Sequence, residues 1–255
     1  MKQKQIILKG LFINYYSQGT GGAPIIFLHG WRSEAAVWLP LFKILTAQSY
    51  TLYALDLPGF GQSEIPKIPF TLRDYAEIVK SFISNLSNPP LPIPNVSIIG
   101  HSFGARVALK LASENQTVIQ KLVLVGSGGA RPWWHTISIG IAKLLKPFFT
   151  PRFMHPLRTK IYQLIGAEDY LATPALKQTF LNILNESLMP LCASIHCPTL
   201  IIWGEHDGEA RLEYGKKMTR VIPNAKLVII KNAGHYPFMD QPKDFIKILE
   251  GFINK

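Results

Sequence analysis

The chain has 255 residues, of which 47% are apolar and 17% are charged, and its formal net charge is +11. This composition is typical of a globular protein with a sizeable core and argues against a disordered chain; no apolar run reaches the roughly 20 residues of a membrane helix. Lys and Arg are spread along the sequence and no nucleic-acid motif accompanies them. We therefore expect a generally basic surface and no nucleic-acid partner.

The N-terminal residues and the two cysteines bear on the cellular compartment of the protein. The N-terminal residues lack the apolar core and the cleavage site of a signal peptide. Cys192 and Cys197 match neither a redox motif nor a zinc-ligand pattern, and no histidine pair has metal-ligand spacing. We predict a cytoplasmic protein with free thiols and no metal.

Strand-like and helical patterns alternate along most of the chain. The continuous apolar run at 25–28 is typical of a strand buried on both faces, and Thr71 with Asp74 forms a capping box that opens a helix. The predicted strands lie at 5–9, 11–17, 25–28, 50–54, 96–99, 121–125, 200–203 and 227–230. The predicted helices lie at 34–47, 71–86, 103–113 and 242–252. This alternation predicts an α/β domain with a largely parallel sheet covered on both faces.

Residues 130–195 break the alternation, because they suggest several helices joined by proline-containing turns. We predict a core domain at 1–129 and 196–255, with residues 130–195 inserted as a helical lid. The segment 133–149 is apolar, aromatic and basic. Three interpretations stay open for it: a wall that contacts the substrate, a surface that touches lipid, or ordinary packing on the core.

A Gly-x-Ser-x-Gly segment at residues 100–104 lies between a predicted buried strand and a predicted helix. A sharp turn there lifts the Ser102 hydroxyl clear of the sheet, and the two glycines let strand and helix approach each other. The N-terminus of the helix also favours a developing oxyanion. We predict Ser102 as the nucleophile of a hydrolase.

A serine nucleophile needs an imidazole base, and the chain offers seven histidines. His235 directly follows the last predicted strand, and strand ends carry the site residues of doubly wound sheets, so we predict His235 as the base. Asp207, after the strand 200–203, is the predicted acid that orients it. Glu205 stays open as the alternative acid.

The oxyanion needs two backbone N–H donors. We assign one to Phe103, directly after the nucleophile, and the other to Trp31, in the loop after the strand 25–28. We expect His29, in the same loop, to be a structural hydrogen-bonding residue. Four further residues are predicted to contact the substrate: Gly30, His101, Trp134 and Tyr236.

Five segments, at 29–31, 56–63, 100–104, 204–207 and 234–237, together resemble the α/β-hydrolase superfamily in its lidded, single-domain, esterase-like branch. The resemblance implies the α/β-hydrolase fold, a mostly parallel eight-stranded sheet flanked by helices, with a Ser-His-Asp triad and no cofactor. It also implies a structural role for the loop 56–63. The chain departs from the family at 208–211, which lacks the proline often found after the acid.

These residues together predict a serine hydrolase that cleaves carboxylic esters of small molecules through an acyl-enzyme. A carbon–carbon bond hydrolase acting on diketone acids with the same triad is one alternative. A ligand-binding receptor on a hydrolase fold is the other. The fold alone does not choose among them.

Overall fold

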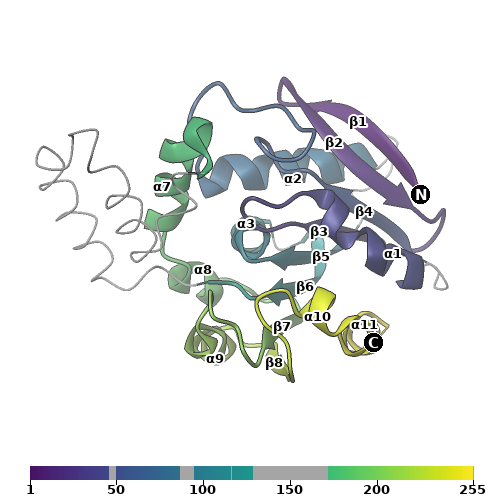
Figure 1. Ribbon diagram of the computed structural model, residues 1–255, viewed down its shortest axis with the longest axis vertical. Helices are drawn as coiled ribbons and strands as arrows, with labels where there is room; N and C mark the ends of the chain where they lie inside the picture. The colour runs from purple at the N-terminus through teal and green to yellow at the C-terminus, as the bar shows by residue number, and fades with distance from the viewer. Residues whose placement is uncertain (46–49, 87–94, 116, 129–171, 255) are drawn as a thin grey trace, which may run out of the picture.

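The sheet has eight strands in the order β1-β2-β4-β3-β5-β6-β7-β8. The computed structural model describes residues 1–45, 50–86, 95–115, 117–128 and 172–254. β2 pairs antiparallel with β1 and with β4, and every other neighbouring pair is parallel. The predicted mostly parallel, eight-stranded sheet flanked by helices is therefore confirmed (Figure 1).

The elements follow the predicted alternation along the chain. The strands are β1 (Lys2–Leu8), β2 (Leu11–Gln18), β3 (Pro24–Leu28), β4 (Thr51–Leu55), β5 (Val96–His101), β6 (Ile119–Val125), β7 (Thr199–Gly204) and β8 (Ala225–Ile230). The helices are η1 (Ala35–Trp38), α1 (Leu39–Leu45), α2 (Leu72–Leu86), α3 (Phe103–Glu114), η4 (Pro174–Leu176), α7 (Lys177–Asn185), α8 (Met189–Ala193), α9 (Leu212–Val221), α10 (Pro237–Asp240) and α11 (Pro242–Ile253).

Two apolar clusters form the core, one on each face of the sheet. Ile26 and Leu28 of β3 join the cluster with α2, α3 and α9, whereas Ile25 and Phe27 join the cluster with α1 and α11. Figure 1 shows α2 and α3 on one side of the sheet and α1 and α11 on the other. Successive side chains of a strand point to opposite faces of the sheet. Because both faces are buried here, β3 is apolar at consecutive positions.

The capping box at the start of α2 forms as predicted. The Thr71 N–H donates to the Asp74 carboxylate at 2.7 Å, and the Asp74 N–H donates to the Thr71 hydroxyl at 3.3 Å. These contacts satisfy N–H groups that the first turn of a helix cannot bond internally.

The predicted lid is only partly described. Its residues 172–195 contain η4, α7 and α8, while the rest of 130–195, including Trp134, lies outside the described residues. Both cysteines are free thiols, as predicted. Within the described part of the chain, no helix is both long and apolar enough to cross a membrane.

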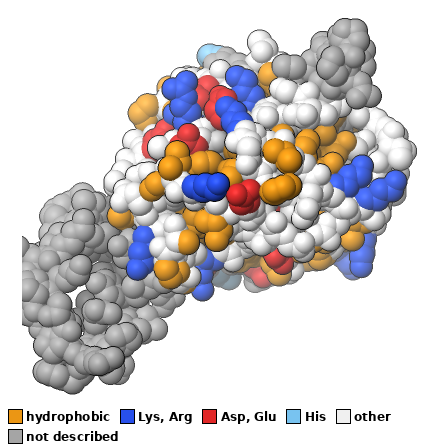
Figure 2. All heavy atoms as spheres, turned by 90° about the horizontal axis from the view of Figure 1, so that it is seen from above, with side chains coloured by type: hydrophobic (Ala, Val, Ile, Leu, Met, Phe, Trp, Pro, Cys, Tyr) orange, Lys and Arg blue, Asp and Glu red, His pale blue; other side chains and the backbone are white. Residues whose placement is uncertain are grey.

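Positive charge is dispersed over the face shown in Figure 2. The Lys and Arg side chains there form several separate groups, with acidic and hydrophobic side chains between them. This face fits the expectation of a generally basic surface rather than one concentrated basic block.

Candidate active site

Ser102 occupies a strained turn between β5 and α3. Its φ of 49° and ψ of −108° lie outside the conformations that residues with a side chain ordinarily adopt. The Ser102 N–H donates to the carbonyl of Val125 at 2.8 Å, which ties the turn to the neighbouring strand β6. A strained, tethered serine at a strand–helix junction is the geometry that the sequence predicted.

Two glycines let β5 and α3 approach closely at this turn. A Cβ atom added to Gly100 would lie 2.5 Å from the carbonyl oxygen of Gly104, and one added to Gly104 would lie 2.3 Å from the carbonyl oxygen of Leu28. Both separations are shorter than atoms can tolerate, and both obstacles are backbone. Any larger residue would therefore displace the turn that carries Ser102.

Asp207 and His235 meet across the loops that follow β7 and β8. The Nδ1 atom of His235 lies 2.9 Å from Oδ2 of Asp207 and 3.1 Å from its Oδ1. The side chain of Asp207 is 1% exposed and that of His235 is 7% exposed, so solvent weakens this contact little. Nδ1–H donates to the carboxylate, so Nε2 is the ring nitrogen that can take up a proton during a reaction.

The loop after Asp207 holds the carboxylate in place through its backbone. The N–H groups of Glu209 and Ala210 donate to Oδ1 of Asp207 at 2.9 and 2.8 Å. Proline at either position would remove a donor, so the departure from the family pattern is compatible with an ordered acid. The alternative acid, Glu205, instead accepts from the N–H of Asn232 at 3.1 Å and does not bond to His235.

Gly126, at the end of β6, lies directly against this pair. Its φ is +53°, and an added Cβ would lie 3.2 Å from the His235 ring and 3.4 Å from Oδ2 of Asp207. The requirement for glycine arises from the close approach of three strand ends, which no local pattern reveals.

His101 does not occupy the place predicted for it. It was expected to contact substrate, but its side chain is fully buried and is not among the residues that line the pocket described below. Its Nε2–H donates to the carbonyl of His235 at 2.9 Å, and its ring lies 4.7 Å from that of His235 between centroids. Burial lowers the pKa of His101 to about 3, so the ring is neutral at ordinary pH. The structure therefore places His101 behind the base, where it supports the backbone of His235.

His29 and the loop 56–63 are structural, as expected. The Nδ1–H of His29 donates to the carbonyl of Gly30 at 2.7 Å, and its Nε2 accepts the N–H of Leu57 at 2.9 Å. The buried carboxylate of Asp56 accepts the N–H of Ala35 at 2.6 Å and the side-chain amide of Asn14 at 2.7 Å. Together these bonds fix the loop after β3 against the loop after β4.

A pocket of about 300 Å³ lies at these strand ends. It is lined by Gly30, Trp31, Arg32, Ser102, Glu209, His235 and Tyr236. The nucleophile and base predicted from the sequence therefore share one pocket, along with the predicted residues Gly30, Trp31 and Tyr236. Sequence reasoning missed Arg32 and Glu209 as pocket residues, although each lies within two positions of a predicted site residue.

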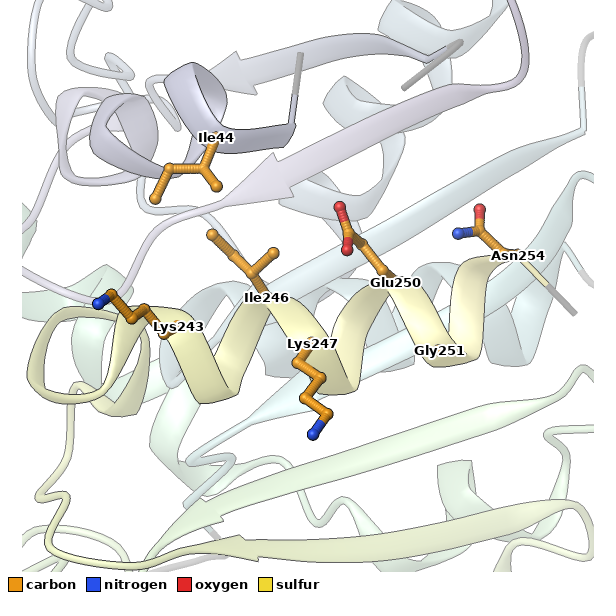
Figure 3. Close-up of a pocket in the computed structure, with 7 residues that line it drawn as sticks. All are labelled: Ile44, Lys243, Ile246, Lys247, Glu250, Gly251 and Asn254. Carbon is orange, nitrogen blue, oxygen red and sulfur yellow. The ribbon is translucent and has the colours of Figure 1, made fainter. Parts of the chain in front are cut away.

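A larger hollow of about 530 Å³ lies between α1 and α11 (Figure 3). It is lined by Ile44, Lys243, Ile246, Lys247, Glu250, Gly251 and Asn254. These residues supply neither a hydroxyl nucleophile nor an imidazole. The pocket that contains Ser102 and His235 is thus the better candidate for chemistry.

The side chain of Trp31 joins the pocket to the described part of the predicted lid. Its ring lies 4.8 Å from Phe60, 5.2 Å from Phe103 and 5.0 Å from Phe180 of α7, measured between ring centroids. Aromatic pairs at these distances stabilise the folded state by more than the burial of their apolar area alone. The position of Trp31 therefore depends on α7 as well as on the core.

Comparison with known proteins agrees with the fold. Residues 25–248 match the model of the alpha/beta hydrolase family. The chain is 26% identical to a pimeloyl-[acyl-carrier protein] methyl ester esterase of Proteus mirabilis, over 91% of this chain and 92% of that protein. It is 27% identical to a 2-hydroxy-6-oxononadienedioate/2-hydroxy-6-oxononatrienedioate hydrolase of Pseudomonas putida, over 95% of this chain and 92% of that protein.

Solved structures show the same architecture. An esterase from Exiguobacterium antarcticum superposes with a TM-score of 0.77 at 22% identity, and the match covers 100% of both chains. Since the family match spans most of the chain and the sheet order agrees with it, the chain belongs to the alpha/beta hydrolase family.

Proposed function

We propose that this protein hydrolyses carboxylic esters of small molecules with Ser102, His235 and Asp207. The observation that carries the proposal is the buried Asp207–His235 contact of 2.9 Å, which opens onto the same pocket as Ser102. An imidazole oriented by a carboxylate is the group that a serine hydroxyl needs in order to attack a carbonyl.

The reaction has two matched halves. Ser102 Oγ bonds to the ester carbonyl carbon while its proton passes to Nε2 of His235 and the carbonyl π electrons move to oxygen. The tetrahedral intermediate then expels the alcohol, which takes the proton from Nε2, and an acyl-enzyme remains. Water repeats the sequence and releases the acid and free Ser102.

The N–H groups of Trp31 and Phe103 are proposed to bind the oxyanion. Phe103 is the first residue of α3, and the first N–H groups of a helix have no acceptor within the helix. Trp31 lines the pocket beside Ser102. Donors held by the backbone stabilise developing charge without reorganising, which is the strongest effect such a site supplies.

The two relatives named above favour different kinds of bond as the one that this protein cleaves. The Proteus mirabilis relative is a methyl ester esterase, which supports the ester proposal. The Pseudomonas putida relative is a hydrolase of an oxo-dienedioate, which favours carbon–carbon bond hydrolysis as the second candidate. Residues 130–195 are proposed as the lid that shapes the pocket for one substrate or the other.

A paired assay tests the proposal. Purified protein is assayed with p-nitrophenyl esters of increasing acyl length and with a 2-hydroxy-6-oxo-dienoate. Ester turnover that falls at least about 1000-fold in Ser102→Ala supports the proposal, because the nucleophile carries the covalent step. Faster cleavage of the dienoate would favour the second candidate, and undiminished ester turnover in Ser102→Ala would refute the role of Ser102.

A further inference from the structure

We propose that Glu209 is an electrostatic part of this site: its carboxylate stabilises protonated His235 during turnover and disfavours substrates that carry a negative charge on the leaving group. This inference rests on the proposed function, because it requires His235 to take up a proton. The alternative is that Glu209 is only a solvated loop residue.

Geometry sets Glu209 apart from the other acids near the site. Its Oε2 lies 3.6 Å from Nε2 of His235, on the opposite side of the ring from Asp207. It lines the same pocket as Ser102. The imidazole therefore lies between two carboxylates, one against the nitrogen that keeps its proton and one against the nitrogen that exchanges it.

The two carboxylates differ in exposure and hence in role. The Asp207 side chain is 1% exposed, whereas that of Glu209 is 67% exposed. Asp207 is suited to fix the orientation of the ring. Glu209 contributes a solvent-screened attraction to the imidazolium, an effect that is modest and should weaken as ionic strength rises.

Other charged or titratable groups also face His235. Asp207 comes from the loop after β7, His101 from the end of β5, and the ring of Tyr236 lies 5.4 Å from that of His235 between centroids. Arg32 lines the pocket from the loop after β3. His101 is neutral because burial lowers its pKa to about 3. Arg32 acts against Glu209 by its charge, so the comparison must change Glu209 alone and leave the others in place.

Glu209→Gln makes this comparison cleanly. The backbone N–H of Glu209, not its side chain, donates to Asp207, so the substitution keeps that bond. Glu213→Gln is the matched control, since Glu213 is exposed in the first turn of α9 and lies outside the pocket. Both variants lose one negative charge from the same region of the chain.

The first measurement is the pH dependence of kcat/KM on p-nitrophenyl acetate. In Glu209→Gln we expect the acidic limb of the pH–rate profile to move to lower pH by about half a unit. At about 1 M salt, we expect this difference from the wild type to shrink. Glu213→Gln should keep the wild-type limb. An unmoved limb in Glu209→Gln, or an equal shift in both variants, overturns the inference.

The second measurement uses a matched pair of esters, 4-acetoxybenzoate and its neutral methyl ester. The ratio of kcat/KM for the anion to that for the neutral ester should rise roughly threefold in Glu209→Gln, because the repelling charge is gone. An unchanged ratio contradicts the selectivity claim.

A third readout does not depend on turnover. His235 is titrated by NMR in Ser102→Ala with and without Glu209→Gln, and the inference requires a lower apparent pKa without the carboxylate. If wild-type ester turnover does not depend on Ser102, the proposed function fails. If it does and the His235 titration is unmoved, only the role of Glu209 fails.

Discussion

At Gly126 the backbone has a φ of +53°, and the space for a side chain is bounded by His235 and Asp207. Gly126→Ala would place a methyl group 3.2 Å from the imidazole and would strain the backbone by about 1 kcal/mol or more. We expect kcat to fall roughly 10- to 100-fold with a cooperative unfolding transition retained, because a displaced base loses its alignment.

Steady-state kinetics and urea unfolding check this prediction together. Gly251→Ala is the control, since nothing lies within 4 Å of the added Cβ in α11. Full activity in Gly126→Ala would show that the base tolerates displacement at this contact.

The sequence was sufficient to predict the residues that follow strands in recognisable segments. Ser102, Asp207 and His235 each lie at a strand end, where a parallel sheet gathers its functional side chains. Gly126 and Glu209 could not be identified this way, because their proximity to His235 depends on how closely separate loops approach. His101 was misplaced because its neighbour Ser102 faces the pocket while its own ring turns into the core.

Among the elements, α3 is bonded through Arg106 both to the strand end that precedes the predicted lid and to α7 within the lid. The buried guanidinium donates to the carbonyls of Gly128 at 3.1 Å, Ile183 at 2.6 Å and Glu186 at 2.8 Å. Gly128 precedes the predicted insertion and the other two lie at the end of α7. Burial lowers the pKa of Arg106 to about 10, which still leaves the group charged at neutral pH.

We predict that Arg106→Met lowers the free energy of unfolding by about 2–4 kcal/mol, because three carbonyls lose their donor. Urea unfolding at neutral pH measures the loss. Lys110→Met is the comparison, one turn further along α3, where the ammonium pairs with Glu186 at 2.8 Å and Glu114 at 3.3 Å. The free energy of unfolding should fall by only about 1 kcal/mol in Lys110→Met. Equal losses in the two variants would mean that the three carbonyls find other partners.

The helix α9 shows why some elements escaped prediction. Only Gly215 and Met218 are buried in it, so few apolar residues mark the face that packs on the sheet. A Cβ at Gly215 would lie 2.8 Å from the ring of Trp203, which means that the helix packs through a glycine. The strands, by contrast, were predictable because burial on both faces makes them continuous apolar runs.

At the scale of the whole molecule, two buried neutral histidines make the fold sensitive to acid. Burial lowers the pKa of His29 to about 4 and that of His101 to about 3, below the ordinary value of 6.5. At pH values below that ordinary pKa, these histidines bind protons in the unfolded chain but not in the native state. Stability is therefore lost as pH falls, by about 1.4 kcal/mol per pH unit for each histidine until the native pKa is reached.

Urea unfolding between about pH 6.5 and about pH 5 tests this dependence. His101→Phe should lose less stability over that interval than the wild type, even if it is less stable at neutral pH. His206→Gln, which removes a largely exposed imidazole, should keep the wild-type slope. An unchanged slope in His101→Phe would show that the ring is protonated in the native state.

The central claim is that Ser102 is an activated nucleophile, and covalent labelling tests it most directly. The protein is treated with a fluorophosphonate probe near neutral pH, and the modified residue is identified by peptide mass spectrometry. The account predicts a single adduct on Ser102, formed much more slowly in His235→Ala. Folded protein that gains no adduct, or gains it at another residue, would contradict the account.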